Sequence, residues 1–333
     1  MVNLNSFLNK KNSLRNISDD YFNSIVEELS GLLTSVSIES NYTDEQLLKD
    51  WNSLLGWKTQ EENINSTSRL GMKLCEHFFP NFYDIEDNKG KSFRNQWTRE
   101  NLIKILRWNR KSHSTPYLSE LKRGIYFCCG MTKNTMYRPQ MAKMICDRYN
   151  PKMVLDPCAG WGGRMLGCVA SGAYYIAFEP NTETFNNLQR LIGFLGIQDK
   201  VRIICDDALN MDMYNLPNFD LILTSPPYFD LEVYTHEDTQ SIKIHNSYES
   251  WSENFLRNLI HKSLSLLNDG GVSCWNVGKV GKNDMNDDVL LYHQERDFMK
   301  FTEFSVVSSK RQSNQSTKKN EKNSDKTIIY KKT

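Results

Sequence analysis

A glycine-rich loop near the middle of the chain could hold a small ligand. Residues 154–163 read Val-Leu-Asp-Pro-Cys-Ala-Gly-Trp-Gly-Gly and follow a strand-like apolar run. Gly160 and Gly162 let the backbone approach a ligand closely at the carboxyl end of a strand, where open α/β sheets bind ligands. Met165 stands where a dinucleotide fingerprint has its third glycine, and no Gly-Lys-Ser/Thr follows, so the loop is not a P-loop. It fits a ligand that carries an ammonium group, which Asp156 could face.

Acidic side chains also end the next two strand-like runs. Glu179 lies 17 residues after Gly162, where a carboxylate can accept hydrogen bonds from both hydroxyls of a ribose. Asp206, Asp207 and Ala208 end the third run, where a carboxylate can accept a hydrogen bond from an adenine amino group. A single acid at a strand end is more often a helix cap or a solvated side chain. Three successive strand ends with suitable groups, however, predict a pocket for S-adenosylmethionine.

A rigid turn ends the fourth run. Residues 219–228 read Phe-Asp-Leu-Ile-Leu-Thr-Ser-Pro-Pro-Tyr. Pro226 and Pro227 fix two φ angles and remove two backbone donors, so the turn presents carbonyl oxygens in a row with Tyr228 just beyond them. In an arbitrary protein such a turn is a strand end with a packing tyrosine. Beside a methyl-donor pocket, Ser225 and the Pro226 carbonyl become candidates to hold an amino group that receives the methyl.

The periodicity of apolar residues predicts the elements that must position these motifs. Residues 1–120 read as helical, with candidate helices at 21–33, 44–54, 67–79 and 99–110. From about residue 150, short β-rich runs alternate with helical stretches at 181–195 and 249–268, which indicates an α/β fold with a doubly wound, mostly parallel sheet. Its strands are predicted at 153–156, 174–179, 201–206, 221–224 and 272–277.

The end of the chain predicts a different connection. The runs 303–309 and 326–331 have no helix between them, so we expect an antiparallel hairpin at the end of the sheet. The change of rhythm predicts a helical N-terminal domain over 1–120 and a ligand-binding domain over 121–333.

Composition sets the broad class of protein. With 39% hydrophobic and 24% charged residues the chain can form a globular core, and its net charge of +1 means that any polyanion site must come from local charge. The eight cysteines have no metal-ligand spacing, so we predict buried thiols in a reducing compartment and no metal. No apolar run approaches the roughly 18 residues of a membrane span, and the start lacks a secretory signal. We expect a soluble cytoplasmic protein without membrane contact; its oligomeric state is not indicated.

The two motifs together resemble the DNA amino-methyltransferases. Asp-Pro-Cys-Ala-Gly-Trp-Gly followed by Leu-Thr-Ser-Pro-Pro-Tyr is similar to the motif pair of these enzymes, which methylate cytosine N4 or adenine N6. The resemblance covers about 135–333. Its first part, Tyr137 to Lys143, is similar to a His-Pro-x-x-Lys-Pro element that wraps the methionine end of the cofactor, although Arg138 and Ala142 depart from that pattern.

The resemblance implies a Rossmann-like methyltransferase fold and a role for each motif. The residues implied to contact S-adenosylmethionine are Tyr137, Pro139, Asp156, Cys158, Gly160, Gly162, Glu179, Pro180, Asp207 and Ala208. Those implied to act on the target amine are Ser225, Pro226, Pro227 and Tyr228, with Tyr228 and Phe229 stacking on the base. Glu179 would hold the ribose. Asp207 rather than Asp206 would hold the adenine, because the family places this acid directly before a small residue.

The base that is methylated is left open between two choices. In the family, serine before Pro-Pro-Tyr is common in cytosine-N4 enzymes, whereas Asp or Asn is usual in adenine-N6 enzymes, so Ser225 favours cytosine. The same motifs would also suit an RNA amino-methyltransferase or, without catalysis, a cofactor-binding protein. The resemblance implies a double-stranded DNA partner, and DNA methylation of the kind found in restriction–modification.

A duplex base must be flipped out before its amine can react, so part of the chain must bind DNA. The helical N-terminal domain is the candidate by elimination, with a basic edge formed by Lys104, Arg107, Arg110 and Lys111. The basic loop 310–322 is a second candidate. The polar segment 230–247 is predicted to be a mobile loop over the target.

Tryptophans of the N-terminal region are predicted to be core residues. They are Trp51, Trp57, Trp97 and Trp108.

Overall fold

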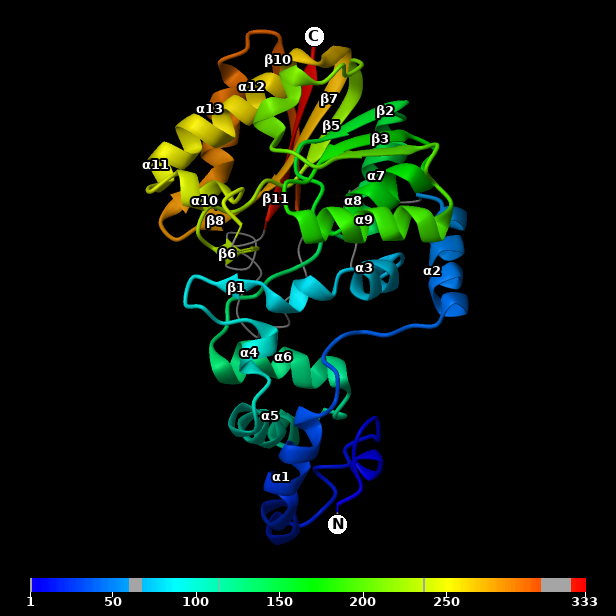
Figure 1. Cartoon of the computed structure of the whole chain (residues 1–333), viewed down its shortest axis with the longest axis vertical. Helices are drawn as coiled ribbons and strands as arrows, with labels where there is room; N and C mark the ends of the chain where they lie inside the picture. The colour runs from blue at the N-terminus through cyan, green and yellow to red at the C-terminus, as the bar shows by residue number, and fades with distance from the viewer. Residues whose placement is uncertain (1, 60–67, 113, 236, 307–324) are drawn as a thin grey trace. The chain divides into compact units, whose positions relative to one another are not determined.

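The structure is a computed structural model that describes residues 2–59, 68–112, 114–235, 237–306 and 325–333. The chain forms two compact units (Figure 1). The helical unit comprises Met1–Ser40, Pro80–Thr135 and Leu231–Tyr234, and the sheet unit comprises Asn41–Phe79, Met136–Asp230 and Thr235–Thr333. This division differs from the predicted boundary at residue 120, because residues 41–79 contribute to the core that covers the sheet. The basic loop 310–322 lies outside the described residues.

Seven strands form the main sheet, in the order β10-β11-β7-β5-β2-β3-β4. They are β2 (Met153–Asp156), β3 (Tyr174–Phe178), β4 (Val201–Ile204), β5 (Phe219–Thr224), β7 (Leu267–Val277), β10 (Met299–Val306) and β11 (Lys326–Lys332). The pairs β2–β3, β3–β4, β2–β5 and β5–β7 are parallel, while β11 runs antiparallel to β7 and β10. The predicted doubly wound, mostly parallel sheet with a C-terminal antiparallel hairpin is therefore confirmed.

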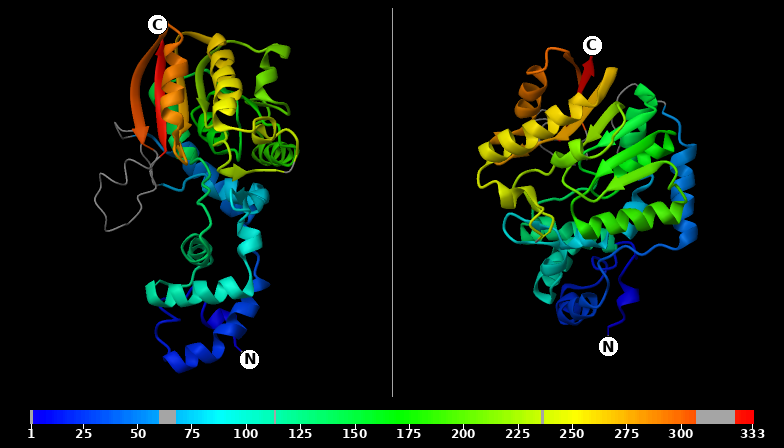
Figure 2. Two further views of the ribbon diagram at one scale, coloured as in Figure 1. Left: turned by 90° about the vertical axis from the view of Figure 1, so that its left-hand side faces the viewer. Right: turned by 45° about the horizontal axis from the view of Figure 1, so that its top comes forward.

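Helices cover both faces of this sheet, as Figures 1 and 2 show. One face packs against α2 (Asp44–Gly56), α3 (Met72–Phe78), α7 (Pro139–Tyr149), α8 (Gly163–Ala170) and α9 (Thr182–Leu195). The other face packs against η3 (Ala208–Met213), α11 (Tyr248–Trp251), η4 (Ser252–Leu256), α12 (Arg257–Ser265) and α13 (Met285–Gln294). Successive strand residues alternate between the two cores: Val154 and Tyr175 face the first, and Leu155 and Ile176 face the second.

Most predicted helices form, with instructive differences at their ends. The helix predicted at 67–79 begins only at Met72, because Gly71 before it has φ +81°, outside the helical region. The helix predicted at 249–268 is a continuous α11–η4–α12 run with one π turn in the middle. Thr43 and Gln46 make reciprocal capping bonds at the start of α2. The helices α13 and α6 (Leu118–Cys129) were not predicted.

The helical unit has its own apolar core. Its elements are η1 (Leu4–Ser6), α1 (Asp19–Thr34), η2 (Pro80–Asp84), α4 (Phe93–Gln96), α5 (Arg99–Ser112), α6 and the paired short strands β1 (Glu86–Asp87) and β6 (Glu232–Val233). Residues from α1, α5 and α6, among them Leu29, Leu102 and Leu121, form this core. Gly124 permits a close approach of α5 and α6, since a Cβ there would lie 2.6 Å from an Ile105 methyl.

The segment 230–247 is only partly a loop. It contains β6, which pairs with β1, and the short helix α10 (Ser241–Ile244). Downstream, β8 (Lys279–Val280) and β9 (Asn283–Asp284) form a two-stranded ladder. In the part of the chain that the structure describes, no helix is long and apolar enough to cross a membrane.

Candidate functional site

The predicted site residues gather where the parallel strands end. The chain runs from β2 outward to β3 and β4 on one side, and then returns to β5 and β7 on the other. The gap between the carboxyl ends of β2 and β5 is thus a topological switch point, where doubly wound sheets bind ligands. The glycine loop leaves β2 at this point and the Ser-Pro-Pro-Tyr turn leaves β5, so two segments 68 residues apart meet at the same edge of the sheet.

Asp156 at the end of β2 is a buried hub. Its carboxylate is 0% exposed and accepts four hydrogen bonds. The backbone N–H of Cys158 (3.1 Å) and the hydroxyl of Thr224 (2.7 Å) donate to Oδ1, while Nε of Arg164 (2.6 Å) and the hydroxyl of Tyr175 (2.6 Å) donate to Oδ2. A carboxylate offers about four lone pairs, so all are used. Asp156 therefore holds the two flanking segments together and does not face a ligand ammonium group, contrary to the prediction.

Arg164, on the first turn of α8, neutralises this buried carboxylate. It is 5% exposed. Its guanidinium also donates to the carbonyls of Cys158 and, at 3.3 Å, Ala159, and it lies 5.3 Å from the ring centroid of Tyr137. The ion pair thus fixes the path of the glycine loop from inside. Burial raises the pKa of the Cys158 thiol well above its ordinary value, so this thiol stays protonated.

Glu179 connects the glycine loop to the end of β3. Its Oε2 accepts from the backbone N–H of Gly160 at 2.9 Å, and its Oε1 accepts from that of Asn181 at 3.0 Å. Gly160 (φ +56°) and Gly162 (φ +72°) adopt the left-handed conformation that the loop requires. One lone pair on each Glu179 oxygen remains for two further donors, which fits a pair of ribose hydroxyls. Pro180 follows and is half-buried.

Burial raises the pKa of Glu179 from 4.5 to about 7, against the lowering effect of its two backbone donors. Because the folded-state pKa is the higher one, the contribution of this group to stability is present below pH 4.5 and is lost as the pH rises through about 7. Ionised Glu179 is therefore held at a cost in the free protein. Donors that bind to it would recover part of that cost.

The two acids after β4 have different surroundings. Both oxygens of Asp206 are used: Oδ1 accepts from the Asp207 N–H and Asn210, and Oδ2 accepts from the Tyr214 hydroxyl. Asp207 accepts only the Leu209 N–H, on Oδ1, from the described residues, and burial raises its pKa. This difference favours Asp207 as the acceptor for an external amino group. Ala208 follows and is buried.

The segment Tyr137–Pro139 reaches the glycine loop because α8 lacks two side chains. A Cβ on Gly163 would lie 2.0 Å from the Tyr137 carbonyl oxygen, and one on Gly167 would lie 2.2 Å from that of Pro139. A Gly-x-x-x-Gly spacing on α8 therefore allows the start of α7 to pack directly on it. Pro139 is itself buried, against Gly71.

The Ser-Pro-Pro-Tyr turn is held by Asn276 on β7. Nδ2 of Asn276 donates to Oγ of Ser225 (3.4 Å) and to the Tyr228 hydroxyl (3.3 Å), and its backbone carbonyl accepts from that hydroxyl (3.4 Å). On its other side, the Asn276 Oδ1 accepts from Thr327 of β11 at 3.4 Å. Pro226 is buried, whereas Ser225, Pro227 and Tyr228 are half-buried. Asn276 thus orients both the serine and the tyrosine.

Phe229 follows the turn with φ +46°, a strained value for a phenylalanine. Its ring packs on Trp251 (centroids 5.9 Å apart) and on the edge of Tyr248 (5.8 Å). The strain and the packing together indicate that Phe229 anchors the chain after the turn.

Several residues of the site were not found from the sequence. Asn276, Arg164 and Tyr175 lie outside the quoted motifs, and Thr224 lies inside the Leu-Thr-Ser-Pro-Pro-Tyr motif but had no predicted role. The Gly-x-x-x-Gly spacing was a visible signal that could have predicted the α7–α8 contact. The described residues contain no group of three His, Cys, Asp or Glu side chains that could hold a metal ion.

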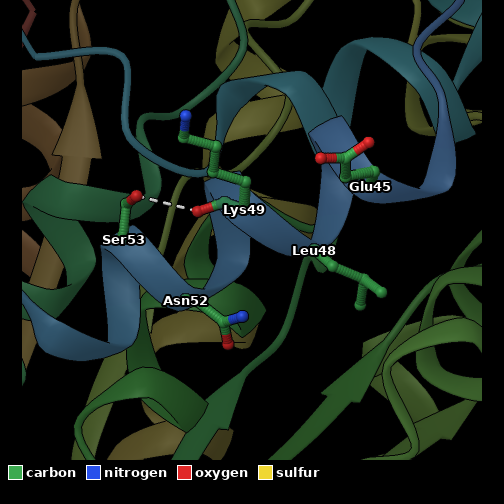
Figure 3. A pocket seen from close by; sticks show the side chains of 5 residues that line it. All are labelled: Glu45, Leu48, Lys49, Asn52 and Ser53. Atoms are coloured by element: carbon green, nitrogen blue, oxygen red, sulfur yellow. Dashed lines mark hydrogen bonds between the residues drawn. The ribbon is translucent and has the colours of Figure 1, made fainter.

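A depression on the outer face of α2 is separate from this site. Glu45, Leu48, Lys49, Asn52 and Ser53 line it, and Figure 3 shows their side chains spread along one helix, with Ser53 bonded to the Lys49 carbonyl at 2.7 Å. All five are exposed and none belongs to the predicted motifs. This surface has no convergent groups for chemistry.

Part of the chain is similar to proteins of known families. Residues 219–333 match the N6/N4 methyltransferase family model, described as DNA methylase. The release factor glutamine methyltransferase of Clostridium botulinum is 26% identical over 136 residues, which are 39% of this chain and 48% of that protein. The chain therefore spans about half the length of this curated relative.

Solved structures are similar at lower identity. TrmN from Thermus thermophilus has a TM-score of 0.41 and 16% identity, over 59% of this chain and 49% of its own. SMU.1697c from Streptococcus mutans, solved in complex with SAH, has a TM-score of 0.38 and 15% identity, over 55% of this chain and 89% of its own.

The strand order and the helices on both faces define a Rossmann-like α/β fold, and the match to the methyltransferase family covers its C-terminal part. The family match begins at β5, so the Ser-Pro-Pro-Tyr turn and the C-terminal hairpin lie within the matched segment.

The hub role of Asp156 predicts a large loss of stability in Asp156→Asn. The NH₂ group of the new amide would face two of the four groups that donate to Asp156, and the buried Arg164 charge would be left unpaired. We therefore expect the free energy of unfolding to fall by about 3–5 kcal/mol. Chemical denaturation measures this change. Asp199→Asn, at an exposed position of the same unit, should change it by less than about 0.5 kcal/mol. Equal effects in the two variants would contradict the hub role.

The contacts of Asn276 predict a specific defect in Asn276→Ala. Without this amide Ser225 and Tyr228 lose their shared orientation, so we expect kcat to fall roughly 10- to 100-fold with little change in affinity for S-adenosylmethionine. Steady-state kinetics with a cofactor titration separates the two effects. Thr327→Val, which removes the hydrogen bond on the outer side of Asn276 and leaves both bonds to the turn, should give a smaller loss of kcat. An unchanged kcat in Asn276→Ala would exclude a positioning role.

Proposed function

We propose that the protein transfers a methyl group from S-adenosylmethionine to the exocyclic amino group of a DNA base, with cytosine N4 favoured over adenine N6. The observation that carries this proposal is the 2.7 Å hydrogen bond from Thr224 to Asp156. This bond joins the residue before Ser225 to the start of the glycine loop, so that an amine held by the turn and a methyl donor held by the loop would lie side by side. The turn lies within the segment that matches the DNA methylase family.

The residues around the glycine loop fit S-adenosylmethionine, which supplies an electrophilic methyl group. Glu179 would accept the ribose hydroxyls on its two remaining lone pairs, and Asp207 would accept the adenine amino group on Oδ2. The left-handed Gly160 and Gly162 keep the loop free of side chains where the ligand passes. The remaining residues around the ligand would be Tyr137, Pro139, Cys158, Pro180 and Ala208. Asp156 would act only by holding the glycine loop in place.

At the target, an exocyclic amine is a poor nucleophile because its lone pair is delocalised into the ring. Oγ of Ser225 already accepts from Asn276, and its other lone pair is available for one amine proton. The Pro226 carbonyl would accept the second. These two bonds would hold the nitrogen and draw it toward a tetrahedral geometry, and the surplus proton leaves to solvent after the N–C bond forms. Positioning and electrostatics supply most of the rate.

The turn is also compatible with a related substrate. The Clostridium botulinum relative is a release factor glutamine methyltransferase, and a glutamine amide, like a base amine, is a planar NH₂ with a delocalised lone pair. The segment matched by the DNA methylase family favours the base. A protein amide is therefore the second candidate.

Product identification tests the proposal directly. The purified protein is incubated with labelled S-adenosylmethionine and unmethylated DNA, RNA or a glutamine-containing release-factor peptide, and the hydrolysed product is identified by mass. We expect N4-methyldeoxycytidine. N6-methyldeoxyadenosine would overturn the choice of base, and label only in RNA or peptide would overturn DNA as the substrate.

Tyr228→Ala tests the site within the same assay. Loss of the stacked ring should lower kcat/KM for DNA roughly 10- to 100-fold, since stacking on an aromatic ring contributes about 1–3 kcal/mol per base. Tyr174→Ala, an exposed tyrosine at the opposite end of a strand in the same sheet, is the matched control and should retain parental activity. Parental activity in Tyr228→Ala would remove the turn from the site.

The pKa of Glu179 predicts that cofactor binding depends on pH. Ribose hydroxyls donate to the ionised carboxylate, so affinity for S-adenosylmethionine should increase by about tenfold as the pH rises from about 6 to about 8 and Glu179 loses its proton. Calorimetric titration across this range measures the change. Glu179→Gln should bind more weakly at the upper end of the range and show no such rise. The same pH dependence in this variant would assign it to another group.

A further inference from the structure

An exposed aromatic and basic surface on the helical unit is not used by the catalytic site. On α5, Lys104, Arg107, Trp108 and Lys111 follow the spacing i, i+3, i+4, i+7 and therefore share one face. On α6, Arg123 and Phe127 are one turn apart. We call these six residues the Trp108–Phe127 patch.

The centre of the patch is a stacked pair of rings. Trp108 and Phe127 lie with their centroids 5.5 Å apart and their planes inclined by 18°. The guanidinium of Arg123 lies 5.6 Å from the Trp108 ring and 5.9 Å from the Phe127 ring. Phe127 is 66% exposed. The Phe127 ring is exposed and its orientation is fixed by Trp108, so a further planar group can stack on it.

The charge around the rings is strongly positive for a chain of net charge +1. Four of the six patch residues are cations, namely Lys104, Arg107, Lys111 and Arg123. Lys104 is paired with Glu100 and Arg123 with Glu120, whereas Arg107 and Lys111 form no ion pair with the described residues. This concentration of charge complements a phosphate backbone.

The structure also corrects the sequence-based version of this surface. Arg110 points into the unit: it donates to the carbonyls of Leu14 and Ile17 and pairs with Asp19 at 2.7 Å, so it supports the fold. Trp108 is half-exposed rather than core, whereas Trp51 and Trp97 are buried as predicted, and Trp57 is half-buried.

We propose that the Trp108–Phe127 patch binds DNA, with an unpaired base stacked on Phe127 and the adjacent phosphates on Arg107 and Lys111. Aromatic side chains beside cations are the general means by which proteins hold single-stranded nucleic acid. The proposal rests on the proposed function for its choice of DNA. It assigns substrate binding to the helical unit through named side chains, independently of the residues that transfer the methyl.

The test is equilibrium binding of the full chain to a short fluorescein-labelled single-stranded DNA, its duplex and an RNA of the same sequence, by fluorescence anisotropy without S-adenosylmethionine. Phe127→Ala should weaken single-stranded DNA binding roughly 5- to 100-fold. Its matched control is Tyr21→Ala, a 50% exposed tyrosine on α1 of the same unit, which should bind as the parent does. Circular dichroism of each variant verifies its fold.

The charges are tested separately through salt dependence. Arg107→Gln with Lys111→Gln removes two cations and should reduce the slope of log Kd against log salt by about 1.4 on single-stranded DNA. Lys10→Gln with Lys11→Gln removes the same charge from exposed positions of the same unit and should leave the slope unchanged.

The outcomes separate this proposal from the proposed function. If Phe127→Ala and Arg107→Gln/Lys111→Gln both bind DNA with the parental Kd and still methylate it, the patch does not bind DNA. The proposed methyltransferase function is then unaffected. If DNA binding depends on the patch but the chain methylates no DNA, the proposed function is overturned and the role of the patch stands. Patch-dependent binding of RNA without DNA binding would overturn DNA as the occupant.

Discussion

The buried ion pair between Asp156 and Arg164 is the constraint on which the sheet unit depends. Removing both charges from water costs several kcal/mol per ion unless every lone pair and proton is satisfied. Here the four donors to the carboxylate come from the glycine loop, α8, β3 and β5. No one of these elements can move without leaving a buried charge unsatisfied. The carboxylate therefore sets the distance between the loop after β2 and the turn after β5.

This use of Asp156 divides the acids at the strand ends into two groups. Asp156 accepts four internal hydrogen bonds and Asp206 accepts three, so both mainly serve the fold. Glu179 and Asp207 keep lone pairs for external donors, and burial raises the pKa of both. A carboxylate that is partly desolvated and incompletely bonded is suited to bind a ligand, because hydroxyl or amino donors stabilise its charge. The same chemical group thus has opposite roles at neighbouring strand ends.

The substrate side follows a similar logic. Asn276 on β7 donates to the hydroxyl oxygens of Ser225 and Tyr228, and Thr327 on β11 donates to Asn276 in turn. The C-terminal hairpin therefore contributes to the site indirectly, because Thr327 holds Asn276 and Asn276 holds the turn. In the helical unit, positive charge is concentrated on α5 and α6 although the chain as a whole is nearly neutral. Local placement, not net charge, gives this unit its affinity for a polyanion in our proposal.

The sequence by itself determined the doubly wound sheet, the acids at its strand ends, and the two motifs that follow β2 and β5. Alternation, glycine spacing and Pro-Pro turns are local properties of the chain. The two compact units divide the chain elsewhere than at the predicted boundary of residue 120, since α2 and α3 pack on the sheet through long-range contacts that local patterns do not encode. Only the tertiary structure decided that Asp156 faces inward, that Arg110 supports the fold and that Trp108 is exposed. Each of these depends on which distant donor or ring reaches a side chain, and that is fixed when the elements pack.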